Sequence, residues 1–180
     1  MKISKSLPVL VTGATGYIAG WVVKNLLDEG ITVHAPIRDL ANTQKRIHLD
    51  KLAEDSSGEI KYFESDLMIE DSYKEAMKGC ELVIHTASPF VMDSKDPQKE
   101  VIEPALKGTQ NVLKTVNETE SVKRVVLTSS VAAIYGNGID GQSVEGGMFN
   151  ESMWNTTSTS TDGEYSYSKT IAEKEAWKIC

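Results

Sequence analysis

The chain has 180 residues, of which 40% are hydrophobic and 25% charged, and it carries a formal net charge of -7 at pH 7. This length and composition predict a globular domain with a substantial hydrophobic core. The acidic balance argues against binding to nucleic acid or to anionic lipid, because both partners require a basic surface.

The cysteines and the apolar runs indicate the cellular compartment. Cys80 and Cys180 are far apart in the sequence, so they predict neither a disulfide framework nor a zinc site, and we expect a protein of the reducing cytoplasm. No apolar run approaches the roughly 18 residues that a membrane helix needs, and residues 7–11 are interpreted as a strand rather than a signal peptide. The histidines are scattered without metal-ligand spacing, so no metal is expected.

In chain order, short β-rich runs alternate with longer helical runs, a pattern typical of parallel βαβ units. We expect strands at residues 7–12, 31–37, 60–63, 82–85 and 124–128. We expect helices at residues 17–29, 42–54, 72–78 and 97–117, and a last helix from residue 164 onward. Residues 136–163 are rich in Gly, Ser, Thr and Asn and predict a long surface loop. The prediction is one α/β domain over residues 1–180.

The turn after the first expected strand contains Gly13 and Gly16 and leads into a helix. Gly13 permits a tight turn, Gly16 lets the backbone approach a pyrophosphate, and the small Ala19 lets the helix pack on the strand. The helix N-terminus then offers free N–H groups and a positive dipole end to phosphates. This predicts a dinucleotide site in a Rossmann-type, doubly wound parallel sheet with helices on both faces. The plain alternative is a tight turn that binds nothing.

The end of the second expected strand indicates which dinucleotide binds. An Asp or Glu there would favour NAD through the ribose hydroxyls. The sequence instead has Ile37 followed by Arg38, and arginine offers a planar charged group to a phosphate. Lys45 can add a second positive charge. We therefore expect NADP(H), the alternative being that Arg38 is a solvated residue at a strand end.

Three residues form a candidate catalytic set. Tyr165 and Lys169 are four residues apart, on one helical face, where the ammonium favours the phenolate form of the tyrosine. The tyrosine can then exchange a proton with a carbonyl or alcohol oxygen. Ser130, after the fifth strand, would hydrogen-bond to the same oxygen as negative charge develops there. Ser129 is an equal candidate by spacing, whereas Tyr167 would diverge from the lysine. Two exposed residues one turn apart are the plain alternative for the Tyr–Lys pair.

Together these motifs resemble the extended short-chain dehydrogenase/reductase family of the NAD(P)-dependent epimerase/dehydratase superfamily. The resemblance is to the branch of dihydroflavonol 4-reductase, cinnamoyl-CoA reductase and methylglyoxal or aldehyde reductase, and it runs from about Val9 to Lys178. It rests on the segments Thr12–Ala19, Arg38–Asp39, Asp66–Leu67, Lys78–Cys80, His85–Pro89, Thr128–Ser130, Asn150–Trp154 and Tyr165–Thr170.

The resemblance implies an NADPH-dependent oxidoreductase that reduces an aldehyde or ketone to an alcohol by hydride transfer. It implies that the pyrophosphate meets Gly13, Thr15, Gly16, Tyr17 and Ile18. By the same resemblance, Arg38 and Lys45 hold the 2′-phosphate, Asp66 and Leu67 flank the adenine, and Thr86, Ala87 and Ser88 border the nicotinamide ribose. Ser130, Tyr165 and Lys169 carry the chemistry, and the last two also contact the cofactor.

The sequence departs from this family in length, because members extend well beyond the catalytic lysine and add a smaller substrate lobe. We expect that C-terminal lobe to be absent, so the chain would be a fragment of a longer enzyme or a cofactor-binding core. Two other functions stay open. One is an NAD-dependent nucleotide-sugar epimerase or dehydratase, which Arg38 and Trp154 disfavour. The other is a catalytically idle NADP-binding fragment or regulator.

The expected partner is a small-molecule carbonyl substrate, whose identity the sequence leaves unspecified. The helix at residues 97–117 and the last helix both carry apolar stripes. In the family such helices pair two subunits, so the resemblance raises the hypothesis of a homodimer. The alternative is that these stripes face the sheet, as they must in any such fold.

Overall fold

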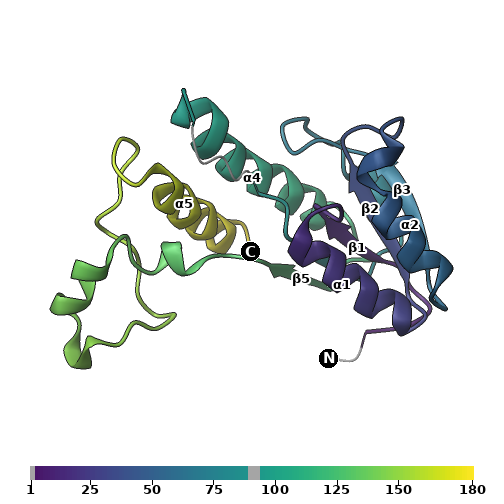
Figure 1. Cartoon of the computed structure of the whole chain (residues 1–180), viewed down its shortest axis with the longest axis horizontal. Helices are drawn as coiled ribbons and strands as arrows, with labels where there is room; N and C mark the ends of the chain where they lie inside the picture. The colour runs from purple at the N-terminus through teal and green to yellow at the C-terminus, as the bar shows by residue number, and fades with distance from the viewer. Residues whose placement is uncertain (1–2, 89–93) are drawn as a thin grey trace. The chain divides into compact units, whose positions relative to one another are not determined.

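The computed structural model describes residues 3–88 and 94–180. Its strands are β1 (Val9–Thr12), β2 (Thr32–Ile37), β3 (Glu59–Glu64), β4 (Leu82–His85) and β5 (Arg124–Leu127). They pair in parallel in the order β3-β2-β1-β4-β5 (Figure 1). The predicted parallel sheet is confirmed, and every strand end lies within two residues of its expected place.

The α-helices are α1 (Tyr17–Asp28), α2 (Ile47–Glu54), α3 (Lys74–Met77), α4 (Glu103–Asn117) and α5 (Glu164–Ile179). Two expected helices are wrong at their first turns. A 3-10 turn at Thr43–Lys45 precedes α2, and a π-helical turn at Gln98–Ile102 precedes α4. Pro104 explains the second case, because proline has no N–H and its ring excludes the carbonyl four residues earlier, so a wider turn relieves the clash.

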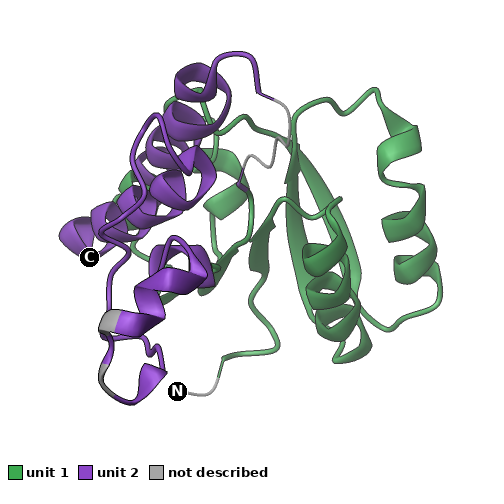
Figure 2. Ribbon diagram, turned by 60° about the vertical axis from the view of Figure 1, so that its left-hand side comes forward, with its two compact units in different colours: residues 1–87, 114–128 green, residues 88–113, 129–180 purple. Residues whose placement is uncertain are grey.

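The chain divides into two compact units (Figure 2). Unit 1 comprises residues 1–87 and 114–128, and it contains the sheet, α1, α2, α3 and the end of α4. Unit 2 comprises residues 88–113 and 129–180, and it contains most of α4, all of α5 and the connection between β5 and α5. The candidate phosphate turn therefore belongs to unit 1, and the candidate catalytic set belongs to unit 2.

Alternation along the strands explains how helices cover both faces of the sheet. Val9 and Val33 pack with Leu27 of α1 in one buried core. His34, the next residue along β2, points to the opposite face, where its Nδ1 lies 2.7 Å from the carbonyl oxygen of Ala76 in α3. Helices therefore pack on both faces, as predicted for a doubly wound fold.

Pro36 lies within β2, although proline is rare inside a sheet. The pairing of β2 with β1 covers Val33 and His34, whereas its pairing with β3 continues to Ile37. Pro36 therefore lies where β2 has passed the end of its ladder with β1, so the missing N–H is tolerated.

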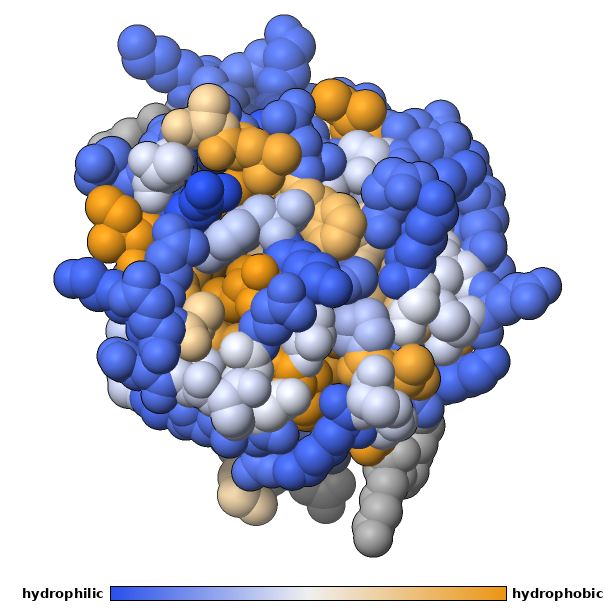
Figure 3. Space-filling model, turned by 90° about the vertical axis from the view of Figure 1, so that its right-hand side faces the viewer, coloured by the Kyte–Doolittle hydropathy of each residue, from blue (hydrophilic) through white to orange (hydrophobic). Residues whose placement is uncertain are grey.

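Two surfaces of unit 1 differ in character. β5 is the last strand of the described sheet, and Val126 on it is 47% exposed. The face at the right of Figure 1, where α2 and β3 lie, is mostly hydrophilic, and its apolar residues form separate small patches (Figure 3). On the face shown in Figure 3, apolar exposure is thus local.

The expected surface loop at residues 136–163 contains short helical turns. It contains 3-10 turns at Gly138–Ser143 and Glu145–Gly147, and a 3-10 turn at Val131–Ala133 precedes the loop. Asn137 caps the turn at Gly138–Ser143 by accepting a hydrogen bond from Ile139 N at 2.9 Å. Short Asn and Asp side chains supply such local caps, which composition alone does not distinguish from an unstructured loop.

Candidate functional site

The glycine turn after β1 has the backbone that the sequence predicts. Gly13 has φ +68°, and a Cβ there would lie 3.0 Å from Cα of Ala87, so a larger residue would be strained and crowded. Gly16 is the N-cap of α1 and makes no side-chain cap, and the first turn of α1 has no acidic residue. The start of α1 therefore keeps its N–H groups available to an anion.

The residues beside this turn divide between core and surface. Ala19 is 2% exposed, in line with its expected role as a small packing residue. Tyr17 and Ile18 are 84% and 58% exposed, and Thr15 is half-buried. The turn thus has an open aromatic and aliphatic surface beside the helix start.

A buried hydrogen-bond network joins the carboxyl ends of β1 and β4. Thr12 Oγ1 accepts hydrogen bonds from the backbone N–H groups of Thr86 and Ala87, each at 3.1 Å. Its own hydrogen must then point to Nδ1 of His85, 2.7 Å away, which requires the proton of a neutral His85 to be on Nε2. The network holds Thr86 and Ala87 against Gly13 where the strand order reverses. Open α/β sheets bind ligands at such a place.

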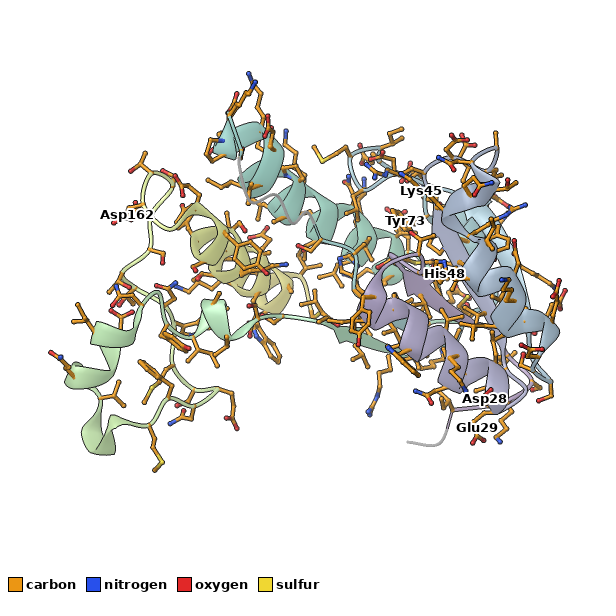
Figure 4. All side chains as sticks on the ribbon, in the orientation of Figure 1. Asp28, Glu29, Lys45, His48, Tyr73 and Asp162 are labelled. Carbon is orange, nitrogen blue, oxygen red and sulfur yellow. The ribbon has the colours of Figure 1, made fainter. Side chains whose placement is uncertain are left out.

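Charged residues gather at the same carboxyl edge of the sheet. Arg38 follows β2, and Asp66 follows β3. Both charges affect the pKa of the Tyr73 hydroxyl. Burial is the largest cause and raises this pKa, the negative charge of Asp66 raises it further, and the positive charge of Arg38 lowers it. Arg38 and Lys45 are exposed, and Lys45 and Tyr73 lie toward the same end of unit 1 (Figure 4). Asp66 and Leu67 are both half-buried.

In unit 2, α5 brings the candidate tyrosine and lysine together. Nζ of Lys169 lies 5.4 Å from the centre of the Tyr165 ring, and it donates a hydrogen bond to Oγ of Ser88. Lys169 is 9% exposed, and burial lowers the pKa of its ammonium. Tyr165, rather than Tyr167, is the tyrosine whose ring lies beside this group. Ser88, Tyr165 and Lys169 therefore form one cluster.

The two candidate serines have different partners. Ser129 Oγ donates to a carboxylate oxygen of Glu173 in α5. Ser130 begins the turn Val131–Ala133, and its Oγ accepts from Ala132 N at 3.2 Å. Within residues 3–88 and 94–180, the Ser130 hydroxyl hydrogen has no acceptor. This arrangement favours Ser130 as the hydroxyl that can donate to a substrate oxygen.

The connection between the serines and α5 is anchored at Asn155. Asn155 is 4% exposed, and its backbone N–H and its side chain hold the carbonyl oxygens of Ala133 and Ala132 at 2.8 and 2.9 Å. A cavity of about 400 Å³ lies beside it, with Phe149 and Trp154 in its walls. The cavity gives unit 2 a mixed apolar and polar concavity near the turn that begins at Ser130.

Three contacts at the site join residues that lie far apart in the sequence and were not predicted from it. Glu173 follows Lys169 by one helical turn, which is a weak signal, but its partner Ser129 is 44 residues away. Asn155 contacts Ala132 across 23 residues, and His85 contacts Thr12 across 73. Contacts over such separations leave no local pattern. Pro89, which ends one of the quoted segments, lies outside the described residues.

Among the residues that the structure describes, no helix combines the length and apolar character needed to cross a membrane. No three His, Cys, Asp or Glu side chains within those residues are grouped to hold a metal ion. The Cys80 thiol is buried, and burial raises its pKa to about 12, so it is a packing residue rather than a nucleophile.

Several reductases are similar to this chain. A cinnamoyl-CoA reductase of Medicago truncatula is 44% identical over 95% of this chain and 52% of its own length. An anthocyanidin reductase of Arabidopsis thaliana is 40% identical over 94% of this chain and 50% of its own. The solved structure of the yeast methylglyoxal/isovaleraldehyde reductase Gre2, complexed with NADPH, matches with a TM-score of 0.80 and 29% identity, over 96% of this chain and 52% of that one.

These relatives confirm the reductase branch that the motifs resemble. The chain spans about half the length of the relatives it matches. A profile of the 3-beta hydroxysteroid dehydrogenase/isomerase family matches residues 10–178, almost the whole sequence. The chain therefore belongs to the 3-beta hydroxysteroid dehydrogenase/isomerase family.

Proposed function

We propose that this chain is the cofactor-binding and catalytic part of an NADPH-dependent oxidoreductase that reduces an aldehyde or ketone to an alcohol. The observation that carries the proposal is the buried Lys169 ammonium beside the Tyr165 ring. A buried cation next to a phenol suits proton transfer to an oxygen that gains negative charge. The relatives support the same reaction class, because each is named as a reductase.

The residues of unit 1 suit NADPH. The Gly13 turn and the uncapped start of α1 offer backbone N–H groups to a pyrophosphate. Arg38 and Lys45 are exposed cations that can bind a 2′-phosphate. The half-buried Asp66 and Leu67 would flank the adenine, and the network of Thr12 and His85 supports Thr86 and Ala87 as ribose contacts.

Each residue of the catalytic cluster has one role in the proposed mechanism. NADPH supplies a hydride when it is bound. The Tyr165 hydroxyl donates a proton to the substrate oxygen, while Lys169 stabilises the charge that remains on the phenol oxygen. Ser130 donates a hydrogen bond to the same substrate oxygen. Ser88 accepts from Lys169 and keeps its ammonium beside the tyrosine.

Calorimetric titration with NADPH and NADH tests the cofactor part. We expect NADPH to bind more tightly than NADH, and Arg38→Ala to remove most of the difference, because the 2′-phosphate is the group that distinguishes them. Lys51→Ala, the loss of another exposed cation in unit 1, is the matched control and should keep the preference. Equal binding of the two nucleotides by the unsubstituted chain would refute the assignment of Arg38.

NADPH oxidation in the presence of a panel of aldehydes and ketones tests the chemistry. Tyr165→Phe should lower kcat by about 100-fold or more, as expected when a general acid is removed, with NADPH binding unchanged. Tyr167→Phe removes a hydroxyl from the same helix and is the control. If the unsubstituted chain binds NADPH but oxidises none with any carbonyl, it is a cofactor-binding protein without turnover, and the reductase proposal fails for this chain.

A further inference from the structure

The turn that begins at Ser130 is too short to supply hydrogen-bond donors for all of its own carbonyl groups. It spans Val131–Ala133. Ala132 N donates to Ser130 Oγ at 3.2 Å, Ala133 N donates to Ser130 O at 2.9 Å, and Ile134 N and Tyr135 N donate to Val131 O at 2.9 and 3.2 Å. A three-residue 3-10 helix leaves its last carbonyls without intrahelical partners. The direction of the Ser130 hydroxyl therefore depends on groups outside the turn.

Asn155 supplies those outside groups. Its backbone N–H donates to the Ala133 carbonyl at 2.8 Å, and its Nδ2 donates to the Ala132 carbonyl at 2.9 Å. Nδ2 also donates to Ser158 Oγ at 2.9 Å, and Oδ1 accepts from the backbone N–H groups of Thr157 and Ser158 at 3.1 and 3.0 Å. The buried Asn155 amide thus links the turn at Val131–Ala133 to the segment at Thr157 and Ser158.

The chemistry of these contacts requires an amide. The Ala132 carbonyl needs a donor, whereas the N–H groups of Thr157 and Ser158 need an acceptor. A carboxylate would meet the second need but would place negative charge against the Ala132 carbonyl. A serine would keep the local turn but would not reach across to Ala132.

A second set of contacts, made by the Asp140 carboxylate, fixes the loop next to Asn155. Asp140 accepts from Gly136 N at 2.8 Å, from Asn137 N at 3.1 Å and from Thr157 Oγ1 at 2.8 Å. A Cβ on Gly136 would lie 2.5 Å from Thr157 Oγ1, so the loop segments at Gly136 and Thr157 are too close for a larger residue at position 136. These contacts tie residues 136–140 to Thr157, two residues after Asn155.

From these contacts we propose that Asn155 is a positioning residue, which sets the orientation of the Ser130 hydroxyl through the carbonyls of Ala132 and Ala133. The inference rests on the proposed function, in which Ser130 donates to the substrate oxygen. Asn155 acts on the chemical step and leaves nucleotide binding alone, because its contacts lie wholly within unit 2 and the phosphate turn lies in unit 1.

Asn155→Asp is the informative variant, since it keeps shape and acceptor but loses the donor. Asn150→Asp is its matched control. Asn150 is an exposed asparagine of the same loop, and its Oδ1 accepts from Ser152 N at 2.9 Å and from Ser152 Oγ at 2.6 Å. Both variants gain the same charge, but only the first loses a bond to the turn. Asn155→Ser, which preserves the local turn, is the second variant in case Asn155→Asp does not fold.

The kinetic expectation separates positioning from general support. A displacement of about 1 Å at a catalytic group can lower a rate by about 100-fold, so kcat of Asn155→Asp should fall by about tenfold to 100-fold with the KM for NADPH unchanged. Acid should restore part of the loss, because a protonated carboxyl can again donate to the Ala132 carbonyl. The ratio of kcat for Asn155→Asp to that of the unsubstituted chain should therefore rise from pH 8 to pH 6.

Amide hydrogen exchange gives a readout that does not depend on turnover. Exchange at Ala132 and Ala133 should be faster in Asn155→Asp and Asn155→Ser than in Asn150→Asp. If exchange at these amides and kcat both match the control, the positioning role is refuted. If the unsubstituted chain reduces no carbonyl, the proposed function fails for this chain, and accelerated or unaltered exchange still decides whether Asn155 holds the turn.

Discussion

Lys169 combines a positive charge with a buried position, and burial lowers the pKa of its ammonium. In the unfolded chain the group titrates near its ordinary value of about 10.4. Between the lowered folded pKa and that value, the unfolded chain binds more protons, so this group makes stability rise with pH. Below that window both states are protonated, and the destabilisation from burying the charge is complete.

We therefore predict that Lys169→Met gains most stability, relative to the unsubstituted chain, at neutral pH. The gain should shrink as the pH rises toward 10.5, where the native lysine is neutral in the fold. Urea unfolding at pH 7 and pH 10 measures this difference, with the exposed Lys51→Met as control. A gain that stays constant between the two pH values would show that the lysine is not held in an environment that disfavours its charge.

A second prediction at the residue scale separates the two serines. Ser130→Ala should lower kcat by about 100-fold, the usual effect of removing one donor to a developing oxyanion. Ser129→Ala removes a contact with Glu173 and should lower kcat by less than about tenfold. Steady-state kinetics of the two variants decides between them, and a larger loss in Ser129→Ala would reverse the assignment.

At the scale of elements, the turn between β1 and α1 depends on the backbone of Gly13. Its φ of +68° is strained for any residue with a Cβ, and Ala87 lies 3.0 Å from where that Cβ would be. We predict that Gly13→Ala lowers the free energy of unfolding by about 1–2 kcal/mol, the usual penalty of a left-handed conformation, and weakens NADPH binding.

Gly138→Ala is the control for this prediction, because Gly138 has open space around its Cβ position and a φ outside the left-handed region. Chemical denaturation and NADPH titration of both variants provide the comparison. Equal stability and equal NADPH affinity in the two variants would show that the turn has room to rearrange.

At the scale of the whole molecule, an exposed apolar side chain on α5 is the basis for a prediction of the association state. Trp177 on α5 is 71% exposed. We predict a homodimer, whose mass by light scattering would be twice the 19.7 kDa of one chain. Trp177→Glu should shift the mass toward that of one chain, because a charge at an apolar contact disfavours association. A single-chain mass for the unsubstituted protein at micromolar concentration would contradict the prediction.

The sequence alone determined the features that depend on residues close together in the chain. The alternation of strands and helices predicted the parallel sheet, since apolar periodicity reports directly on which face of an element is buried. The Gly13–Gly16 turn and the four-residue spacing of Tyr165 and Lys169 were readable for the same reason: each depends on neighbours in the chain. The π-helical turn before Pro104 was missed because proline changes a helix without ending it.

The tertiary structure alone decided what distant segments do to one another. It showed Lys169 bonded to Ser88, Ser129 bonded to Glu173, and Asn155 holding the turn that begins at Ser130. These pairs are separated by 81, 44 and 23 residues along the chain, so no periodicity or spacing rule reports them. Burial has the same origin: the charge of Lys169 is visible in the sequence, whereas its desolvation exists only once the chain has packed around it.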